Sequence, residues 1–416
     1  MKKILFLNSF YYPKYNVNGI CSNEIIKVLK DNYEIYTLSY KNLGEKSYYN
    51  NDGEKIYKVR PRLFFLLRDY SECGKNKFEK MLAKYSSLLI QKVKRILYFF
   101  NYPVTSLIAI YRYTKAAKKI VEMHNIDTVI SVFQPFETIV AADYLKKKYS
   151  VKEIIYVLDT LSNENKKDNL INRYKKKMGR KAEKKYYVKA DLIISMRCHE
   201  NNFNDSFYDD IRNKLVFSDI PLLRTLKNNN KEPVFDTVFI NLVYTGTLDK
   251  ERRDPTKICE LIQLYNNFNN PKIIAHFFSR GDCEDILKKY KCVKRYGFVK
   301  NDISVNALFS ADALISVEAK NSDMISAKIF EYMSTGKKII HFNETESDVL
   351  LPYLKRYNNT LIINMNNNIH ENIQLINNFI NNYNAEKIQM EKVFFENTPN
   401  YTAKIIDDFI GDDKNA

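Results

Sequence analysis

The residue types best suited to binding chemistry gather in residues 321–342, NSDMISAKIFEYMSTGKKIIHF. Polar residues that favour a helix start, Asp323 among them, precede apolar residues at helical spacing, and Gly336 and a strand-like run follow. The start of such a helix offers free N–H groups to an anion, and Lys328 adds a positive charge there. Glu331 lies just beyond, where its carboxylate can accept hydrogen bonds from two neighbouring hydroxyls.

An anion site beside a carboxylate that binds a diol suits a nucleotide sugar, which carries both a diphosphate and a ribose. The simpler alternative is a capped helix that leads into a buried strand, as in most α/β proteins. In that interpretation Glu331 is a solvated helix residue. The residues alone leave both interpretations open.

The stretch resembles the donor-site signature of family 4-type glycosyltransferases, which have the GT-B fold and include bacterial enzymes of capsular and other cell-surface polysaccharides. In that signature two acidic residues flank seven others. Here the pair is Asp323 and Glu331, with Asp in place of the usual first Glu. The resemblance implies that Asp323 and Glu331 are the catalytic pair. Asp323 would lie near the transferred sugar and Glu331 would hold the ribose hydroxyls.

The resemblance also reaches residues 245–252, TGTLDKER, where a strand is expected to run into a glycine turn. The family motif has Arg after this Gly and Lys five residues later, whereas this chain has Thr247 and Arg252. Phe298, in RYGFV, stands where the fold holds the nucleotide base against backbone groups. The donor-binding residues that the resemblance implies are Gly246, Thr247, Arg252, Phe298, Ser326, Ala327, Lys328 and Glu331.

The first half of the chain opens with a buried strand at residues 3–8, a loop that carries Gly19, and a helix at residues 23–29. A strand, a glycine loop and a helix are typical of a doubly wound domain. The family uses this loop for donor phosphates or acceptor, although a plain turn glycine is an equal alternative. Asp159 ends a later strand, EIIYVLD, on the side where ligands bind in open sheets. It is a candidate acceptor contact or a residue that caps a turn.

Length, net charge and cysteine content limit the possible classes of function. The chain has 416 residues, a net charge of +17, and six scattered cysteines without a CxxC pair. The length favours two domains, and the cysteines favour a reduced, cytosolic chain without a zinc site. No eighteen consecutive residues are apolar, so no transmembrane helix is expected. The charge favours an anionic partner. Nucleic acid is not expected, because the sequence has no helix-turn-helix pattern, aromatic RNP block or zinc finger.

Residues 60–113 mix apolar and aromatic runs with basic residues, as in LFFLL, ILYFFNY and LIAIY. Such mixing suits a helix that lies in a membrane interface, and a pair of core helices with solvated basic faces is the alternative. A basic run follows at residues 166–189. It is either a solvated helix face or a site for lipid headgroups or an acceptor pyrophosphate.

Together these features predict an α/β protein of two doubly wound Rossmann-like domains facing across a cleft, the GT-B fold. Residues 1–222 would bind the acceptor, residues 234–395 the nucleotide sugar, and residues 396–416 would return to the first domain. The resemblance implies transfer of a sugar to an acceptor hydroxyl, with retention of configuration and without a metal or other cofactor. The acceptor would be a glycan, for example one linked to a polyprenyl lipid. The protein would be cytoplasmic and would lie on the inner face of the cell membrane.

Two other function classes remain open at this point. A sugar-nucleotide 2-epimerase shares the fold and would need no acceptor. A non-catalytic protein that binds an anionic membrane would need only the basic faces. Substitution of Asp323 or Glu331 would then leave its membrane binding unchanged.

Overall fold

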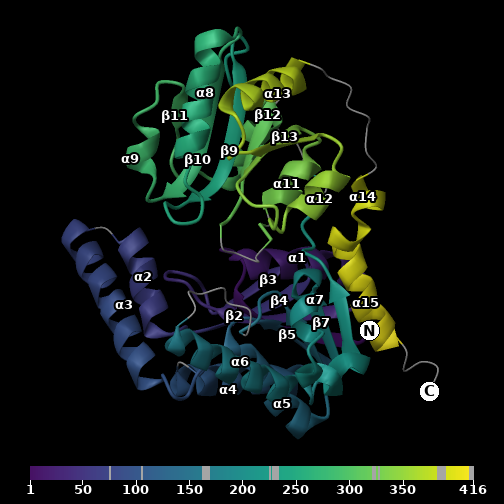
Figure 1. The fold of residues 1–416 in the computed structure, drawn as a ribbon. Coiled ribbons are helices and arrows are strands. Elements are labelled where there is room, and N and C mark those ends of the chain that lie inside the picture. The colour runs from purple at the N-terminus through teal and green to yellow at the C-terminus, as the bar shows by residue number, and fades with distance from the viewer. Residues whose placement is uncertain are drawn as a thin grey trace. The chain divides into compact units, whose positions relative to one another are not determined.

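The computed structural model describes residues 1–74, 76–104, 106–161, 169–223, 226, 234–320, 325–326, 328–381 and 390–411. The chain forms two compact units (Figure 1). Unit 1 comprises Met1–Pro221 and Pro399–Ala416, and unit 2 comprises Leu222–Thr398. Each unit has its own parallel sheet and its own core, so each is described by itself.

Unit 1 is built on an eight-stranded sheet in the order β3-β4-β2-β1-β5-β6-β7-β8. All described neighbours pair in parallel except β3 and β4, which form an antiparallel hairpin at one edge. The strands are β1 (Lys3–Phe10), β2 (Glu34–Tyr40), β3 (Tyr48–Asn51), β4 (Glu54–Val59), β5 (Thr128–Phe133), β6 (Lys152–Val157), β7 (Leu192–Met196) and β8 (Leu215–Ser218).

Helices cover both faces of this sheet, because successive strand residues point to opposite sides. Ile4 and Phe6 of β1 pack with helices α1 and α15, whereas Leu5 and Leu7 pack with α4 and α5. The helices of unit 1 are α1 (Val17–Leu29), α2 (Leu63–Cys73), α3 (Lys77–Leu97), α4 (Leu107–His124), α5 (Phe136–Tyr149), α6 (Leu170–Tyr187), α7 (Glu200–Phe203) and α15 (Pro399–Gly411), with short 3-10 helices η1 (Arg197–His199) and η2 (Ser206–Lys214).

Unit 2 is built on a six-stranded parallel sheet in the order β11-β10-β9-β12-β13-β14. Its strands are β9 (Ile240–Leu248), β10 (Ile273–Gly281), β11 (Val293–Arg295), β12 (Ala313–Val317), β13 (Lys338–Asn343) and β14 (Thr360–Asn364). Its helices are α8 (Thr256–Phe268), α9 (Glu284–Leu287), α10 (Asn301–Ser310), α11 (Lys328–Ser334), α12 (Leu351–Arg356), α13 (Ile369–Asn381) and α14 (Met390–Val393), with the 3-10 helix η3 (Phe395–Asn397).

The two parallel sheets confirm the expectation of two doubly wound units, and some local expectations are corrected. The β3–β4 hairpin and the short β11 were not expected, because their sequences lack an apolar run. Strand β9 continues to Leu248 instead of ending before Gly246, since the latter still pairs with Ser279 of β10. Helix α11 begins at Lys328, so Ile325 lies before it.

Candidate functional site

Among the parallel strands of each sheet, the chain order reverses at one point. In unit 2 this point lies between β9 and β12, and in unit 1 it lies between β1 and β5. Open parallel sheets bind ligands just beyond the carboxyl ends of the strands at such points, because the connections there diverge to opposite faces. The residues that follow these four strands are therefore the candidates for ligand contact.

In unit 2, helix α11 is attached to the end of β9 through a buried phenol. The Tyr332 hydroxyl accepts a hydrogen bond from the Thr245 N–H at 2.8 Å and donates to the Thr245 carbonyl at 3.3 Å. Burial raises the pKa of Tyr332 to about 12, so the hydroxyl keeps its proton. These bonds hold Lys328 and Glu331 of α11 next to the strand end that carries Gly246.

Glu331 and Lys328 form an ion pair on α11, three residues apart. The Glu331 side chain is largely buried and the Lys328 side chain is more than one-third exposed. Ser326 precedes the helix, and its carbonyl accepts a hydrogen bond from the Ile329 N–H at 3.1 Å. The other two predicted residues of this stretch, Asp323 and Ala327, lie outside the described residues.

The end of β9 has a backbone that depends on glycine. Gly246 has a φ of +151°, which side chains with a Cβ rarely adopt. The Tyr244 hydroxyl donates to the Thr247 carbonyl at 2.9 Å, which closes the chain around this glycine. Gly246 thus gives the end of β9 an unusual backbone conformation at the reversal point of the sheet.

Arg252 lies in the loop after β9, where the sequence placed it. Its guanidinium Nε lies 3.3 Å from a carboxylate oxygen of Asp249, and its side chain is 58% exposed. Its carbonyl accepts a hydrogen bond from the Lys320 N–H at 3.1 Å, which joins the loops after β9 and β12. The positive charge of Arg252 is therefore already paired with a carboxylate.

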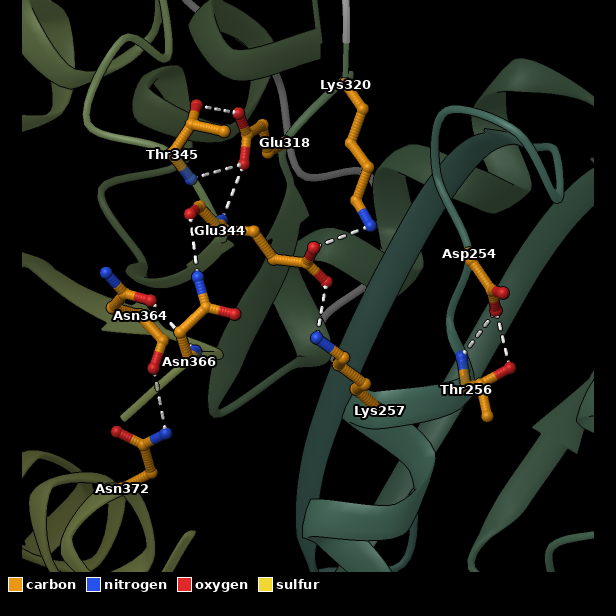
Figure 2. Close-up of polar contacts among 10 residues, drawn as sticks. All are labelled: Asp254, Thr256, Lys257, Glu318, Lys320, Glu344, Thr345, Asn364, Asn366 and Asn372. Atoms are coloured by element: carbon orange, nitrogen blue, oxygen red, sulfur yellow. Dashed lines mark hydrogen bonds and ion pairs between the residues drawn. The ribbon is translucent and has the colours of Figure 1, made fainter. Parts of the chain in front are cut away.

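One carboxylate pairs two lysines, Lys320 after β12 and Lys257 at the start of α8 (Figure 2). Glu344, directly after β13, contacts Lys320 at 2.7 Å and Lys257 at 2.9 Å. These two ammonium groups lower the pKa of Glu344 by hydrogen bonding, with the Lys320 contribution larger. The buried Glu318 accepts from the N–H groups of Glu344 and Thr345 at 2.6 and 3.2 Å, which fixes the loop.

One cation at this edge was missed by the sequence analysis. Arg280, near the end of β10, places its Nε 3.4 Å from the Thr247 Oγ1, and its guanidinium lies 5.4 Å from the centre of the Phe298 ring. Phe298 is 79% exposed, so one face of the ring is open to a ligand. The available signal was an Arg two residues beyond the apolar run at residues 273–278.

In unit 1, a pocket of about 440 Å³ opens at the reversal point between β1 and β5. It contains Asp159, a predicted site residue, and Asn18, the neighbour of Gly19. Its lining residues are Ser9, Phe10, Asn16, Asn18, Tyr40, Arg62, Phe65, Arg68, Tyr102, Pro103, Gln134, Pro135, Phe136, Asp159 and Leu161.

Gly19 lies in the first turn of α1, not in a free loop. A Cβ built on it would lie 2.2 Å from the Phe10 carbonyl oxygen at the end of β1. The Asn16 side chain caps the helix by accepting from the Gly19 N–H at 2.9 Å. Gly19 therefore lets helix α1 approach β1 closely enough to form one wall of the pocket.

Asp159 is the acidic group of this pocket. Its carboxylate has no hydrogen bond or ion pair with the described residues, and burial raises its pKa. Arg62, also in the lining, is held by Glu137 through two hydrogen bonds of 2.7 Å each. The pocket thus offers one unpartnered carboxyl group to a ligand.

The surface of α3 is the other unusual feature of unit 1. Figure 1 shows α2 and α3 side by side, and Ser87 of α3 donates to the Phe64 carbonyl of α2 at 3.1 Å. The apolar side chains of α3 lie on another face, in solvent. Those that are exposed are Phe78, Met81, Leu82, Tyr85, Leu88, Leu89, Val93, Ile96 and Leu97.

This exposure contradicts, for α3, the interpretation of residues 60–113 as a pair of core helices, whereas Ala109 and Tyr113 of α4 are buried. Exposed Leu107, Ile108 and Tyr111 at the start of α4 extend the apolar surface. We call the exposed apolar residues of α3 and the start of α4 the apolar surface. In the described part of the chain, no helix has both the length and the apolar character needed to cross a bilayer.

Comparison with known proteins supports the fold. No family model and no curated protein sequence matches the chain. One similar solved structure is trehalose-6-phosphate from E. coli bound with UDP-2-fluoro glucose, with 10% sequence identity over 98% of this chain and 99% of that chain and a TM-score of 0.59. A second is WaaG, a glycosyltransferase involved in lipopolysaccharide biosynthesis, with 11% identity over 97% of this chain and 99% of that chain and a TM-score of 0.57. A third is the UDP-GlcNAc 2-epimerase from Methanocaldococcus jannaschii, with 11% identity over 98% of this chain and 99% of that chain and a TM-score of 0.57. At such low identity the likeness shows the fold alone, which is GT-B.

Proposed function

We propose that the protein transfers a sugar from a nucleotide-sugar donor to an acceptor hydroxyl, with retention of anomeric configuration as in the family 4-type enzymes. The main support for this proposal is a contact between two distant segments of unit 2. The bonds of Tyr332 to Thr245 join the two segments singled out in the second half of the sequence, at the reversal point of the unit 2 sheet. Of the three similar folds, one was solved bound with UDP-2-fluoro glucose, one is named a glycosyltransferase and one a UDP-GlcNAc 2-epimerase.

The donor would lie on unit 2. Glu331 would accept hydrogen bonds from the ribose hydroxyls, and Asp323 would orient the transferred sugar. The diphosphate would contact Lys328, Arg252 and the backbone N–H groups of Ser326 and Ala327. Phe298 would lie at the base and Gly246 with Thr247 along the diphosphate. Cations placed before the reaction stabilise the negative charge that grows on the leaving diphosphate, so no metal is required by this scheme.

Donor binding would change the hydrogen-bond partners of the Lys328–Glu331 ion pair. A bound donor would offer hydroxyl groups to the carboxylate and phosphate oxygens to the ammonium group, so each member of the pair would exchange its partner. Both groups keep a charge-assisted hydrogen bond in this exchange, each worth roughly 1.5–3 kcal/mol. The pair therefore holds the Glu331 carboxylate in place before the donor arrives.

The acceptor would lie on unit 1, in the pocket beside Gly19. Asp159 would accept a hydrogen bond from the acceptor hydroxyl, since its carboxylate has no other partner among the described residues. Asn18 and Ser9 add polar contacts that suit a sugar. We propose residues 1–222 as the acceptor domain and residues 234–395 as the donor domain, with the C-terminal helix completing the first.

We further propose that the acceptor is a polyprenyl-linked glycan of a bacterial cell surface, such as a capsule precursor, and that the protein binds the inner face of the membrane. The apolar surface supports this. It is flanked on α3 by exposed basic residues, among them Lys84, Lys92 and Arg95. A helix with exposed apolar residues and basic neighbours binds anionic lipid through both burial and charge. Tyr102 and Pro103, between α3 and α4, line the pocket.

Membrane binding is tested by flotation with vesicles of phosphatidylglycerol and phosphatidylcholine at two salt concentrations. Wild type should float with anionic vesicles, less so at high salt, and should not bind duplex DNA. The double variant Phe78→Glu with Leu89→Glu should stay at the bottom of the gradient. Phe268→Glu with Val238→Glu, which alters two equally exposed apolar residues of unit 2, is the matched control. Equal flotation of both double variants would refute the membrane proposal.

The donor assignment is tested by thermal unfolding of wild type and Glu331→Ala with UDP, GDP, ADP and their sugars. A ligand at about a hundred times its Kd stabilises by about 2.7 kcal/mol, which is readily measured. One nucleotide class should stabilise wild type and should have less effect on the variant. A matched control is Glu260→Ala, which removes an exposed carboxylate of α8 in the same unit. Unchanged donor affinity of Glu331→Ala would exclude its proposed role.

The alternative activity is sugar-nucleotide 2-epimerisation, favoured by the likeness to an epimerase fold. Incubation of the protein with the stabilising nucleotide sugar and no acceptor separates the two. An epimerase returns a nucleotide sugar with changed configuration at C2, whereas a transferase leaves it unchanged until an acceptor is added. A protein that only binds membranes would show neither reaction.

A further inference from the structure

The strand pairing at the end of β9 places one cation beside the predicted donor turn. Strands β9 and β10 stay paired in parallel to their last residues, with Thr247 opposite Arg280 and Leu248 opposite Gly281. Gly281 has a φ of +133°, and a Cβ there would lie 1.7 Å from the Leu248 carbonyl oxygen. Because only glycine permits this close approach, the pairing holds Arg280 at Thr247.

Arg280 differs from four neighbouring cations, which are held in ion pairs. In the described part of the chain, Arg252 is paired with Asp249, Lys328 with Glu331, and Lys320 and Lys257 with Glu344. Arg280 has no ion pair with the described residues; its recorded contacts are the Thr247 hydroxyl and the Phe298 ring. It is also exposed, so its charge is open to an anion.

We propose that Arg280 is the main cation for the diphosphate of the donor, in place of the positive residue that this chain lacks at position 247. The inference rests on the proposed function and deepens it. Thr247 holds Nε, which leaves the two terminal nitrogens of the guanidinium free. Such a planar fork binds two phosphate oxygens at once. The Phe298 ring supports the guanidinium from one side and keeps it extended.

Arg253 is the rival cation, because it also lacks an ion pair with the described residues. It is half-buried, whereas Arg280 is exposed, so the charge of Arg253 is less open to a ligand. Arg253→Ala is therefore one arm of the test.

The experiment measures binding of a nucleoside, its monophosphate and its diphosphate, using whichever of UDP, GDP and ADP stabilises wild type. Titration calorimetry gives the three Kd values for wild type, Arg280→Ala, Arg253→Ala and Arg295→Ala. Arg295 lies on the neighbouring strand β11 and is paired with Glu284, so its variant is the matched control. Arg280→Ala should lose at least tenfold in diphosphate affinity and keep its nucleoside affinity, and Arg295→Ala should change neither.

A second variant moves the charge. Thr247→Arg in the Arg280→Ala background puts a guanidinium on the facing position of β9 and should restore much of the preference for diphosphate over nucleoside. If Arg280→Ala does not fold, Arg280→Gln replaces it in every arm.

The outcomes are distinguishable. If wild type binds no nucleoside diphosphate, both the proposed function and this inference fail. If wild type prefers the diphosphate and Arg280→Ala keeps that preference, the inference alone is overturned, and loss of the preference in Arg253→Ala would assign the role to Arg253.

Discussion

The hydroxyl of Tyr332 accepts a hydrogen bond from the N–H of Thr245 at 2.8 Å, across 87 residues of chain. Tyr332 lies on the helix that carries Lys328 and Glu331, and Thr245 precedes the glycine at the end of β9. The bond is buried and therefore shielded from water, which makes its loss more damaging than that of an exposed bond. It gives the candidate donor site a fixed internal geometry.

Tyr332→Phe should reduce both stability and nucleotide binding. The change leaves the Thr245 N–H buried without a partner, which costs roughly 1–3 kcal/mol in free energy of unfolding. Urea unfolding measures this loss, and calorimetry measures diphosphate affinity. Tyr265→Phe is the matched control, since its hydroxyl donates to Asn377 at 2.9 Å in the same unit. The control should lose stability only. A Tyr332→Phe protein with wild-type affinity would show that this bond does not organise the site.

Gly19→Ala should destabilise unit 1 and impair the pocket. The new Cβ would meet the Phe10 carbonyl oxygen, so helix α1 must move away from β1, at roughly 1–3 kcal/mol. Denaturant unfolding measures the loss, and acceptor-dependent sugar transfer measures the effect on the pocket. Gly411→Ala at the end of α15 has open space around the new Cβ and should be neutral or slightly stabilising. Equal stability of the two variants would contradict the proposed close packing.

Asp159→Asn should stabilise the protein while it slows sugar transfer. Burial raises the pKa of Asp159, so the folded state favours the protonated form. The stability that this group contributes is therefore present at low pH and is lost as pH rises through the raised pKa. The amide carries no charge, so the variant should exceed wild type in Tm at pH 8 and match it at pH 4.

Transfer assays on Asp159→Asn complete this test. The rate should fall because the amide is a weaker acceptor for a substrate hydroxyl than a carboxylate. The exposed Asp209, paired with Arg212 at 2.8 Å, provides the control Asp209→Asn, which should change neither the Tm profile nor the rate. A higher Tm with an unchanged transfer rate would remove Asp159 from the acceptor site.

Glu153→Gln should change the pH dependence of stability without affecting the site. Glu153 is fully buried on β6, and neither carboxylate oxygen has a hydrogen-bond partner among the described residues. Burial raises its pKa to about 8. The contribution of Glu153 to stability is therefore full below the ordinary carboxyl range and is lost as pH rises through about 8.

The measurement is urea unfolding of wild type and Glu153→Gln at pH 5 and pH 9. The wild-type loss between these values should be several kcal/mol, at most about 5, and the variant should lose less. Glu251→Gln, an exposed change in unit 2, should follow the wild-type profile. Parallel profiles for wild type and Glu153→Gln would mean that this carboxyl does not titrate between the two pH values.

Several features followed from the sequence alone because they depend on neighbours along the chain. Continuous apolar runs such as residues 3–8 predict buried parallel strands, and both sheets of the structure contain them. Gly336, with a φ of +71° just after α11, follows from the same local rules. The roles of Asp323 and Glu331 remain predictions, because they came from a resemblance and Asp323 lies outside the described residues.

The tertiary structure alone decided which charges are already paired and which apolar faces are left open. Arg280 meets Thr247 only because β10 pairs in parallel with β9, and Glu344 meets Lys257 only because α8 begins beside the end of β13. Likewise, the helical spacing of apolar residues in α3 would be the same whether that face of the helix were buried or exposed. The structure shows that it is exposed. The sequence determined the elements by local physics, whereas pairing and burial join residues distant in the chain and required the fold.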